Sequence, residues 1–408
     1  MSATRQLHNV AIYLGFSIAT SAIGLGSVMV MTRLIPPSEY GLIGVFFSLL
    51  FFVAPMVSLS ADGLIAVNKS TLDADHYRTF QQTYIFIAYV GFAVLQLLFI
   101  GALAAGAYRD PLLAGTPLFG LVRFLAGMAG TEYVVEQRPV TFGLMSVATT
   151  LFSLLMTVVL IKLFGPWGGF RVIAMFTADL LMLGVRYWGR LTLLLQPIWD
   201  RKVGAQLIRF GLPSLAAVAG AWALNESDKI VVAREAGMHA AGIYSAAAGL
   251  AVIMVTFNQS LTNALYPDMF RQMAARPHSM RSILLRHCAS FVGFTSAFAL
   301  AVLGAYFLFG NLLLPPRYLG GRAVFVCLVL TGIAISVYRP FGLAADYLRM
   351  GRIRAMAITL GGIVTIVVAD LGVRHGSLLW APAGIACGYL CAAFVLLSAI
   401  RWQQERLP

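Results

Sequence analysis

Long apolar runs separated by short polar segments form the pattern of this chain. Seven stretches without Asp, Glu, Lys or Arg are each long enough to cross a bilayer as one helix: 6–32, 40–61, 79–108, 139–161, 236–267, 287–316 and 375–400. Five more are comparable in length but are interrupted by charge: 117–137, 172–188, 210–233, 323–348 and 355–373. Because backbone groups in lipid must pair within their own segment, all twelve are predicted to be membrane-spanning helices.

Composition leads to the same class of protein. Apolar residues make up 60% of the 408 residues, and charged residues make up only 11%. Soluble domains carry about 25% charged residues, so a water-soluble enzyme, a disordered protein and a secreted disulfide scaffold are excluded. The four cysteines fall in apolar stretches and show neither disulfide nor zinc spacing. We therefore expect an all-α polytopic membrane protein, monomeric, without metal or cofactor.

The chain contains no compact basic domain that could bind nucleic acid. We therefore attribute the net charge of +13 to the cytoplasmic loops of a membrane protein. With connections alternating from a cytoplasmic N-terminus, the cytoplasmic side receives 18 basic residues: Arg5, Lys69, Arg78, Arg138, Arg186, Arg190, Arg201, Lys202, Arg209, Arg271, Arg276, Arg281, Arg286, Arg349, Arg352, Arg354, Arg401 and Arg406. The other side receives eight: Arg33, Arg109, Lys162, Arg171, Arg234, Arg317, Arg322 and Arg374. This asymmetry places both termini in the cytoplasm.

The longest polar connection, roughly 189–209, joins the sixth and seventh spans. Its segment Pro197–Phe210 mixes apolar and basic residues, and we expect an amphipathic helix on the cytoplasmic surface. The predicted organisation is an N-terminal six-helix lobe over 1–190, a linker over 191–209 and a C-terminal six-helix lobe over 210–408.

The two halves also share a local spacing. Arg33 and Gly41 in the first connection are eight residues apart, as are Arg234 and Gly242 in the seventh, and the two pairs are offset by 201 residues. Together with the six-plus-six topology, this spacing favours a duplicated transporter whose halves are related by an axis along the membrane normal.

Motifs for nucleotide hydrolysis and catalysis are missing from the sequence. Gly63–Ser70 approaches a phosphate-binding loop, but Asn68 replaces the second glycine, and a membrane helix cannot supply the strand that such a loop follows. The six histidines are scattered and form no cluster. We therefore expect a transport protein that is not an enzyme.

Three basic residues lie inside predicted spans, where a charged side chain costs about 2.5–3.5 kcal/mol. Arg339 lies about 15 Å along its helix from Arg349, Arg123 lies about 9 Å from the outer end of the fourth span, and Lys229 lies in the outer part of the seventh. Such residues face a bundle interior or a wet cavity. They are candidates for an anion site, since the arginine fork suits phosphate oxygens. The alternative is that each pairs with an acid, for instance Lys229 with Glu226 or Asp228.

The buried acids are candidates for ion coupling or gating. Asp179 is central in the sixth span, where it is either a proton or cation site or part of a structural ion pair. Asp228 and Asn225 lie one turn apart and are placed to coordinate a cation or to orient Lys229. Asp62 and Asp346 lie near cytoplasmic helix ends, which favours a gate or a structural pair.

Glu132 and Glu136 lie one turn apart near the inner end of the fourth span. Their mutual repulsion would raise the pKa of one of them, and Arg138 is close enough in sequence to reduce this effect.

Four segments resemble a known family. Thr32–Gly44 (TRLIPPSEYGLIG) resembles the first loop of bacterial oligosaccharide flippases, and Phe210–Val232 is similar to their seventh helix, with its Gly-Leu-Pro start and Asn-x-x-Asp-basic end. Ala240–Ile253 and Tyr266–Phe270 are similar to the start and end of their eighth helix. The chain thus resembles the O-antigen and polysaccharide flippases, in the superfamily that also holds multidrug extruders and the lipid II flippase.

The resemblance implies two six-helix lobes around a cationic cavity that opens alternately to either side. It implies that undecaprenyl-pyrophosphate-linked oligosaccharides cross the bacterial inner membrane, with a polysaccharide polymerase and glycosyltransferases as functional partners and membrane lipids as surroundings. Relatives use a proton or sodium gradient. The acid that some drug-extruding relatives carry in the first helix is missing here, since 6–32 contains no Asp or Glu.

Two other classes remain open. A secondary multidrug or metabolite exporter of the same architecture is the main alternative, although acid-rich cavities suit organic cations better than this basic set. A membrane-embedded glycosyltransferase or O-antigen ligase is expected to have a large periplasmic loop, and every outer connection here is short.

Overall fold

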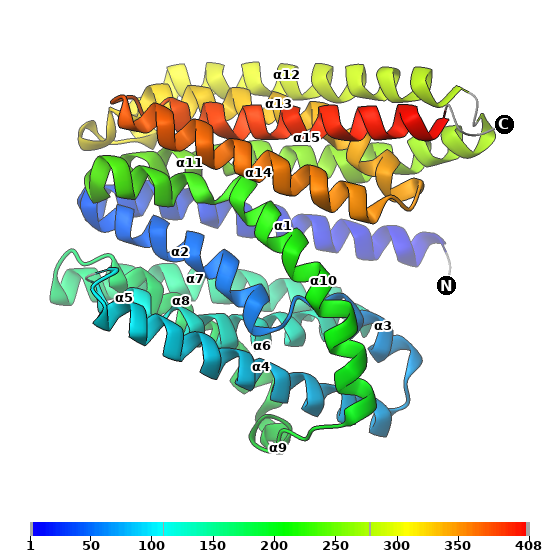
Figure 1. The fold of residues 1–408 in the computed structure, drawn as a ribbon. Coiled ribbons are helices and arrows are strands. Elements are labelled where there is room, and N and C mark those ends of the chain that lie inside the picture. The colour runs from blue at the N-terminus through cyan, green and yellow to red at the C-terminus, as the bar shows by residue number, and fades with distance from the viewer. Residues whose placement is uncertain (1–2, 109, 277–278, 405–408) are drawn as a thin grey trace. The chain divides into compact units, whose positions relative to one another are not determined.

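The computed structural model describes residues 3–108, 110–276 and 279–404, and these residues are almost entirely helical (Figure 1). Arg109 and Arg406, two of the residues used for the orientation, lie outside them. The helices are α1 (Ala3–Leu34), α2 (Pro37–Val57), α3 (Gly63–Thr71), α4 (Ala74–Ala104), α5 (Pro111–Ala114), α6 (Thr116–Val135), α7 (Pro139–Phe164), α8 (Gly169–Tyr187), α9 (Leu191–Leu195), α10 (Arg201–Asn225), α11 (Ser227–Ala275), α12 (Met280–Leu313), α13 (Gly321–Tyr347), α14 (Gly351–Arg374) and α15 (Trp380–Gln404).

Twelve of these helices account for the twelve expected spans. In the described part of the chain, eleven are long and apolar enough to cross a membrane by length and composition. The twelfth is α8, a helix of 19 residues that carries Arg171, Asp179 and Arg186 and is therefore less apolar. The expected all-α fold with twelve membrane helices is confirmed.

The seventh span is interrupted, which the sequence did not lead us to expect. α10 ends at Asn225, Glu226 leaves the helical conformation with φ −130° and ψ −16°, and α11 begins at Ser227. A second break at Gly237, where φ is 84°, separates the end of the seventh span from the eighth. Glycine adopts this left-handed conformation without steric cost, so the chain reverses there.

The connection before this span also differs from the expectation of a separate surface helix. Asp200 accepts hydrogen bonds from the backbone N–H groups of Lys202 and Val203, both at 2.9 Å, and so caps a helix that starts at Arg201. From Arg201 this helix continues as α10 without interruption to Asn225. The residues 201–209 are therefore the first turns of a span.

The chain divides into two compact units. The first comprises Met1–Ile35 and Phe46–Val218, and the second comprises Pro36–Val45 and Ala219–Pro408. This division falls within α10 and assigns the first turns of α2 to the second unit. The division into lobes at 190 and 210 stays a prediction.

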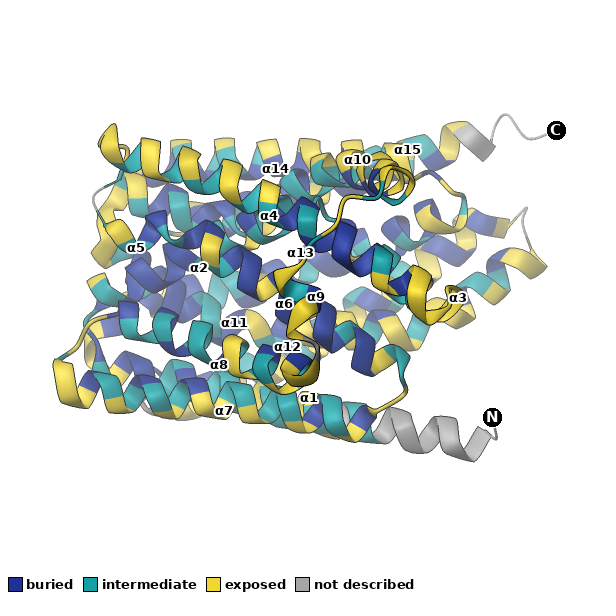
Figure 2. Cartoon of the chain, turned by 90° about the horizontal axis from the view of Figure 1, so that it is seen from below, coloured by how far each residue is buried: buried dark blue, intermediate teal, exposed yellow. Residues whose placement is uncertain are grey.

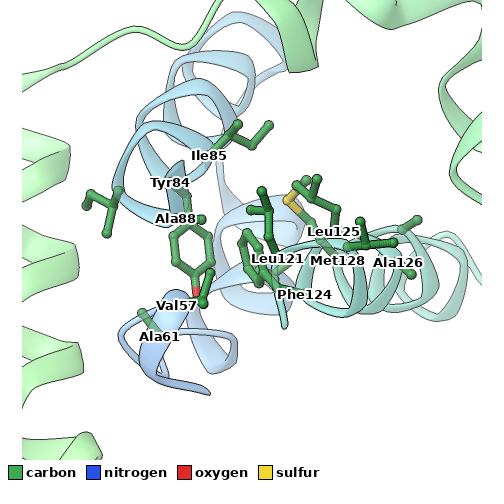
Figure 3. Close-up of a cluster of buried hydrophobic side chains, with 14 of the residues drawn as sticks. Val57, Ala61, Tyr84, Ile85, Ala88, Leu121, Phe124, Leu125, Ala126 and Met128 are labelled. Atoms are coloured by element: carbon green, nitrogen blue, oxygen red, sulfur yellow. The ribbon is translucent and has the colours of Figure 1, made fainter. Parts of the chain in front are cut away.

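The core of the first unit lies where α2, α4 and α6 meet (Figure 3). The ring of Tyr84 on α4 packs edge-on against Phe124 on α6 at 4.8 Å between centroids, and Val57 of α2 is fully buried beside them. Tyr84 donates its hydroxyl hydrogen to Asp62 at 3.0 Å. This packing fixes the face of α6 opposite the exposed Arg123.

An ionic network holds α6 against α8. The Arg186 guanidinium on α8 donates to Glu132 at 2.6 Å and to Glu136 at 2.8 Å, and Gln81 and Tyr77 on α4 also donate to Glu132. Lys69 and Arg138 add ion pairs to Glu136 at 3.4 and 3.5 Å. The principal counter-charge to the two glutamates is therefore Arg186, not the expected Arg138.

The second unit is built around α13, whose residues are largely buried, whereas α12 and α14 carry exposed outer faces. Figure 2 shows exposed residues along α14. α14 and α15 approach closely through glycines. A Cβ on Gly388 would lie 2.5 Å from the carbonyl oxygen of Gly361, and a Cβ on Gly361 would lie 2.6 Å from that of Gly388. Small residues at such crossings let membrane helices pack backbone against backbone.

The shared spacing of the two halves corresponds to a symmetric contact within the second unit. A Cβ on Gly41 would lie 2.2 Å from the carbonyl oxygen of Met238, and a Cβ on Gly242 would lie 1.6 Å from that of Pro37. The offset of 201 residues relates Gly41 to Gly242 and also Pro37 to Met238. Gly41 therefore contacts Met238, and its equivalent Gly242 contacts Pro37, which is the equivalent of Met238. A local two-fold axis requires this reciprocity.

Replacing Gly242 with alanine is expected to destabilise the protein. A methyl group cannot fit 1.6 Å from the Pro37 oxygen, so the α2–α11 crossing must separate, at a cost of about 1–3 kcal/mol. The apparent melting temperature in detergent measures this effect. Gly304→Ala on α12 is the matched control, because no atom lies within 4 Å of its Cβ position. Equal melting temperatures for the two variants would contradict the proposed crossing.

Glu136 is expected to make stability dependent on pH. Its hydrogen bond to Arg186 lowers its pKa from the ordinary value of 4.5. The ionised carboxylate therefore stabilises the fold above about pH 4.5, and this contribution is lost as the pH falls through the lowered value. The melting temperature of Glu136→Gln should be lower than wild type at pH 7, and the gap should narrow below pH 4.5. A gap that stays unchanged below pH 4.5 would contradict this role of the Glu136 carboxylate.

Candidate functional site

Two residues that were singled out separately in the sequence form one pair in the first unit. Arg123 projects from α6, and its Nη1 atom donates to both carboxylate oxygens of Asp179 on α8, at 3.1 and 3.2 Å. The Arg123 side chain is 55% exposed, whereas that of Asp179 is only 15% exposed. The carboxylate thus neutralises the arginine from one side, and the other side of the guanidinium remains open.

The open side of Arg123 faces a cavity of about 520 Å³ between α1, α6, α7 and α8. Five hydroxyl side chains line this cavity together with the pair: Thr20, Thr131, Ser146, Thr149 and Thr150. Three of them, Ser146, Thr149 and Thr150, follow the spacing i, i+3, i+4 on α7 and so share one helix face.

The cavity offers both kinds of hydrogen-bonding group. Thr131, Thr149 and Thr150 donate their hydroxyl hydrogens to carbonyls of their own helices, at 3.0, 2.8 and 2.8 Å. Their oxygens are therefore left as acceptors, while the guanidinium of Arg123 is a donor. A polyhydroxylated anion matches this set, because its hydroxyl groups donate and its charged oxygens accept.

A second opening of about 230 Å³ lies on another side of the same pair, between α2, α6 and α8. It is mainly apolar. Its walls are formed by Phe46, Phe47, Leu50, Phe51, Ala54, Pro55, Phe119, Val172, Met175 and Phe176, with Arg123 and Asp179 as the charged residues. Arg123 and Asp179 thus stand at the boundary between a hydroxyl-lined cavity and an aromatic groove.

A separate polar cluster surrounds the break at Glu226 in the second unit. Lys229 forms an ion pair with Glu226 at 2.5 Å, so of the two acids considered as its partner, it pairs with Glu226. The side-chain oxygen of Asn225 accepts a hydrogen bond from Tyr389 on α15 at 2.6 Å. Asp228 is buried and accepts a hydrogen bond from Tyr244.

Oδ1 of Asp228 and Nε of Arg339 are among the buried polar atoms of this unit that have no hydrogen-bond partner among the described residues. Arg339 on α13 lies within electrostatic range of Tyr389. The cluster thus collects Asn225, Asp228, Lys229 and Arg339 in one unit, while Arg123 and Asp179 belong to the other. A single cavity that holds all three basic residues stays a prediction.

The two gate candidates have structural partners. Asp62, between α2 and α3, accepts the hydrogen bond from the core residue Tyr84. Asp346 near the end of α13 forms an ion pair with Arg354 of α14 at 2.5 Å. Each ties neighbouring helices of one unit together.

The hydroxyl wall of the cavity was missed from the sequence. The Ser146-x-x-Thr149-Thr150 stripe was a detectable signal, because it places three hydroxyls on one face of a span that contains no charged residue before Lys162. The pairing of Arg123 with Asp179, which are 56 residues apart, has no comparable local signal.

Comparison with a family of polysaccharide biosynthesis proteins gives a match over residues 30–313. No curated protein sequence matches the chain.

Several solved structures are similar in fold. An inward closed conformation of the lipid II flippase MurJ has a TM-score of 0.72 at 11% identity, covering 95% of this chain and 87% of that one. An inward-facing multidrug resistance MATE family transporter of the MOP superfamily has a TM-score of 0.68 at 14% identity, covering 97% and 98%. The eukaryotic MATE transporter AtDTX14 has a TM-score of 0.55 at 16% identity, covering 99% and 98%. At these identities the likeness establishes the fold alone.

Proposed function

Because this chain belongs to the polysaccharide biosynthesis protein family, we propose that it is a flippase for undecaprenyl-pyrophosphate-linked oligosaccharides. It moves these units from the cytoplasmic to the periplasmic leaflet of the bacterial inner membrane, for the synthesis of O-antigen, capsule or exopolysaccharide. Its fold, shared with a lipid flippase and with multidrug transporters, supports this proposal.

The observation that carries the proposal is the half-exposed Arg123 beside a hydroxyl-lined cavity inside a membrane protein. A lipid-linked glycan has to take a charged pyrophosphate and hydrated sugars through hydrocarbon. Arg123 supplies a counter-charge with hydrogen-bond donors, and the acceptor oxygens of Thr131, Thr149 and Thr150 replace part of the water around the sugar hydroxyls.

Asp179 gives this site a means of coupling to an ion gradient. The carboxylate and the substrate phosphate compete for the same guanidinium, so protonation of Asp179, or a cation bound to it, frees Arg123 for the substrate. Binding energy that differs between the inward-open and outward-open states then shifts their populations. In this scheme Asp179 is the first coupling candidate.

The cluster at the break in the seventh span is the second functional region. Within the second unit, Arg339, with its unpartnered Nε atom, binds anionic groups of the substrate, and Lys229 contributes once its pair with Glu226 opens. Asp228 and Asn225 position these charges through Tyr244 and Tyr389. Asp62 and Asp346 act at the gates, where their partners are Tyr84 and Arg354.

Neutralising Arg123 is expected to abolish glycan export. A hydrogen bond to a charged group contributes about 1.5–3 kcal/mol, which corresponds to about a 10- to 150-fold loss of affinity. Arg123→Gln keeps much of the side-chain volume and removes the charge. Surface glycan, measured in a strain that depends on this flippase and at matched protein levels, is the measurement. Arg138→Gln, an exposed arginine outside both cavities, is the control. Undiminished export in Arg123→Gln would refute the assigned role.

Asp179→Asn is expected to separate substrate binding from coupling. Without the carboxylate, Arg123 stays free, so phosphate-containing substrate should bind at least as tightly while export loses its dependence on the ion gradient. Export by proteoliposomes with and without an imposed pH or sodium gradient distinguishes these effects. Gradient dependence equal to wild type would exclude Asp179 from coupling.

A further inference from the structure

We propose that the aromatic groove between α2, α6 and α8 binds the prenyl chain next to the pyrophosphate of the transported lipid. This inference rests on the proposed function and extends it. It assigns the first isoprene units to a protein surface in the first unit instead of leaving the whole chain in the bilayer.

The first argument is the order of chemical environments. Arg123 and Asp179 line both the hydroxyl-rich cavity and the aromatic groove. The environments therefore run from hydroxyl groups, through one guanidinium, to phenylalanine rings. A prenyl-linked glycan has the same order: sugar, phosphate, hydrocarbon. A phosphate bound at Arg123 then places the sugar in the hydroxyl-rich cavity and the hydrocarbon chain in the aromatic groove.

The second argument is the construction of the groove. Phe46, Phe119 and Phe176 form a continuous series, with centroids 5.0 Å apart for Phe46 and Phe119 and 4.5 Å apart for Phe119 and Phe176. Phe47 extends it at 5.8 Å from Phe46. Phe46 is fully buried, and the half-buried rings of Phe119 and Phe176 offer the apolar surface against which the branched, unsaturated units of a prenyl chain pack.

The third argument is depth and access. Phe46 lies nine residues after Pro37 at the start of α2, which is about 13.5 Å along the helix axis. The hydrocarbon layer is about 30 Å thick, so the groove lies near its middle. Phe51, at the groove edge, is 62% exposed, so a chain can enter there.

A crosslinking experiment tests the inference in the full-length protein. Benzoylphenylalanine replaces Phe51 in one variant and Phe152 in the other, and the proteins are reconstituted in phospholipid vesicles with radiolabelled undecaprenyl phosphate. Phe152 is the matched control, because it is an exposed phenylalanine on α7 that lines neither opening. Both substituted positions are exposed, so neither change disturbs the core.

The expected result is at least fivefold more labelled lipid on position 51 than on position 152. Arg123→Gln should reduce the label at position 51 to the level at position 152, because the phosphate loses its anchor. Farnesyl phosphate should compete for the label, while dodecyl phosphate and inorganic phosphate should compete at least fivefold less effectively.

Three results would overturn the inference: equal labelling at positions 51 and 152, labelling that is unchanged by Arg123→Gln, or equal competition by dodecyl and farnesyl phosphate. The first two exclude a specific lipid site, and the third identifies a general amphiphile groove. Failure here is distinct from failure of the proposed function. If Arg123→Gln abolishes glycan export while positions 51 and 152 label equally, the flippase assignment stands and the groove assignment falls.

Discussion

The cost of placing a charge in hydrocarbon governs this molecule. An isolated ionised side chain at the middle of a bilayer costs several kcal/mol, so each one needs a partner or water. Arg186 meets this requirement with two glutamates, Lys229 with Glu226, and Arg123 with Asp179. The pairs of Arg186 and Arg123 join α8 and α6, and they determine which faces of these two helices are turned inward, whereas Lys229 and Glu226 are only three residues apart.

The same requirement distinguishes structural pairs from the candidate site. Arg186 is only 10% exposed and its guanidinium is occupied by Glu132 and Glu136, so no donor surface is left for a ligand. Arg123 is 55% exposed and is held by one carboxylate through a single nitrogen. An arginine that is only half satisfied, beside a cavity of about 520 Å³, is a place where a phosphate can complete the set of hydrogen bonds.

Close backbone contacts supply the other constraint. The reciprocal approach of Gly41 and Gly242 leaves no room for a side chain, and it gives structural meaning to a spacing repeated in both halves of the chain. The break at Glu226 interrupts the seventh span within the membrane, where irregular backbone is tolerated only if protein or a cavity surrounds it. The polar cluster around Glu226 provides such surroundings.

Much of this protein was determined by the sequence alone. Hydropathy and local motifs depend only on neighbouring residues in the chain. They predicted the twelve helices, the membrane class and the family, and the match over residues 30–313 confirmed the family. The tertiary structure decided what depends on distant ones: that Asp179 is the partner of Arg123, that Arg186 rather than Arg138 holds Glu132 and Glu136, and that the seventh span breaks at Glu226. The sequence shows that a buried charge needs a partner, but which partner it finds depends on how the helices pack.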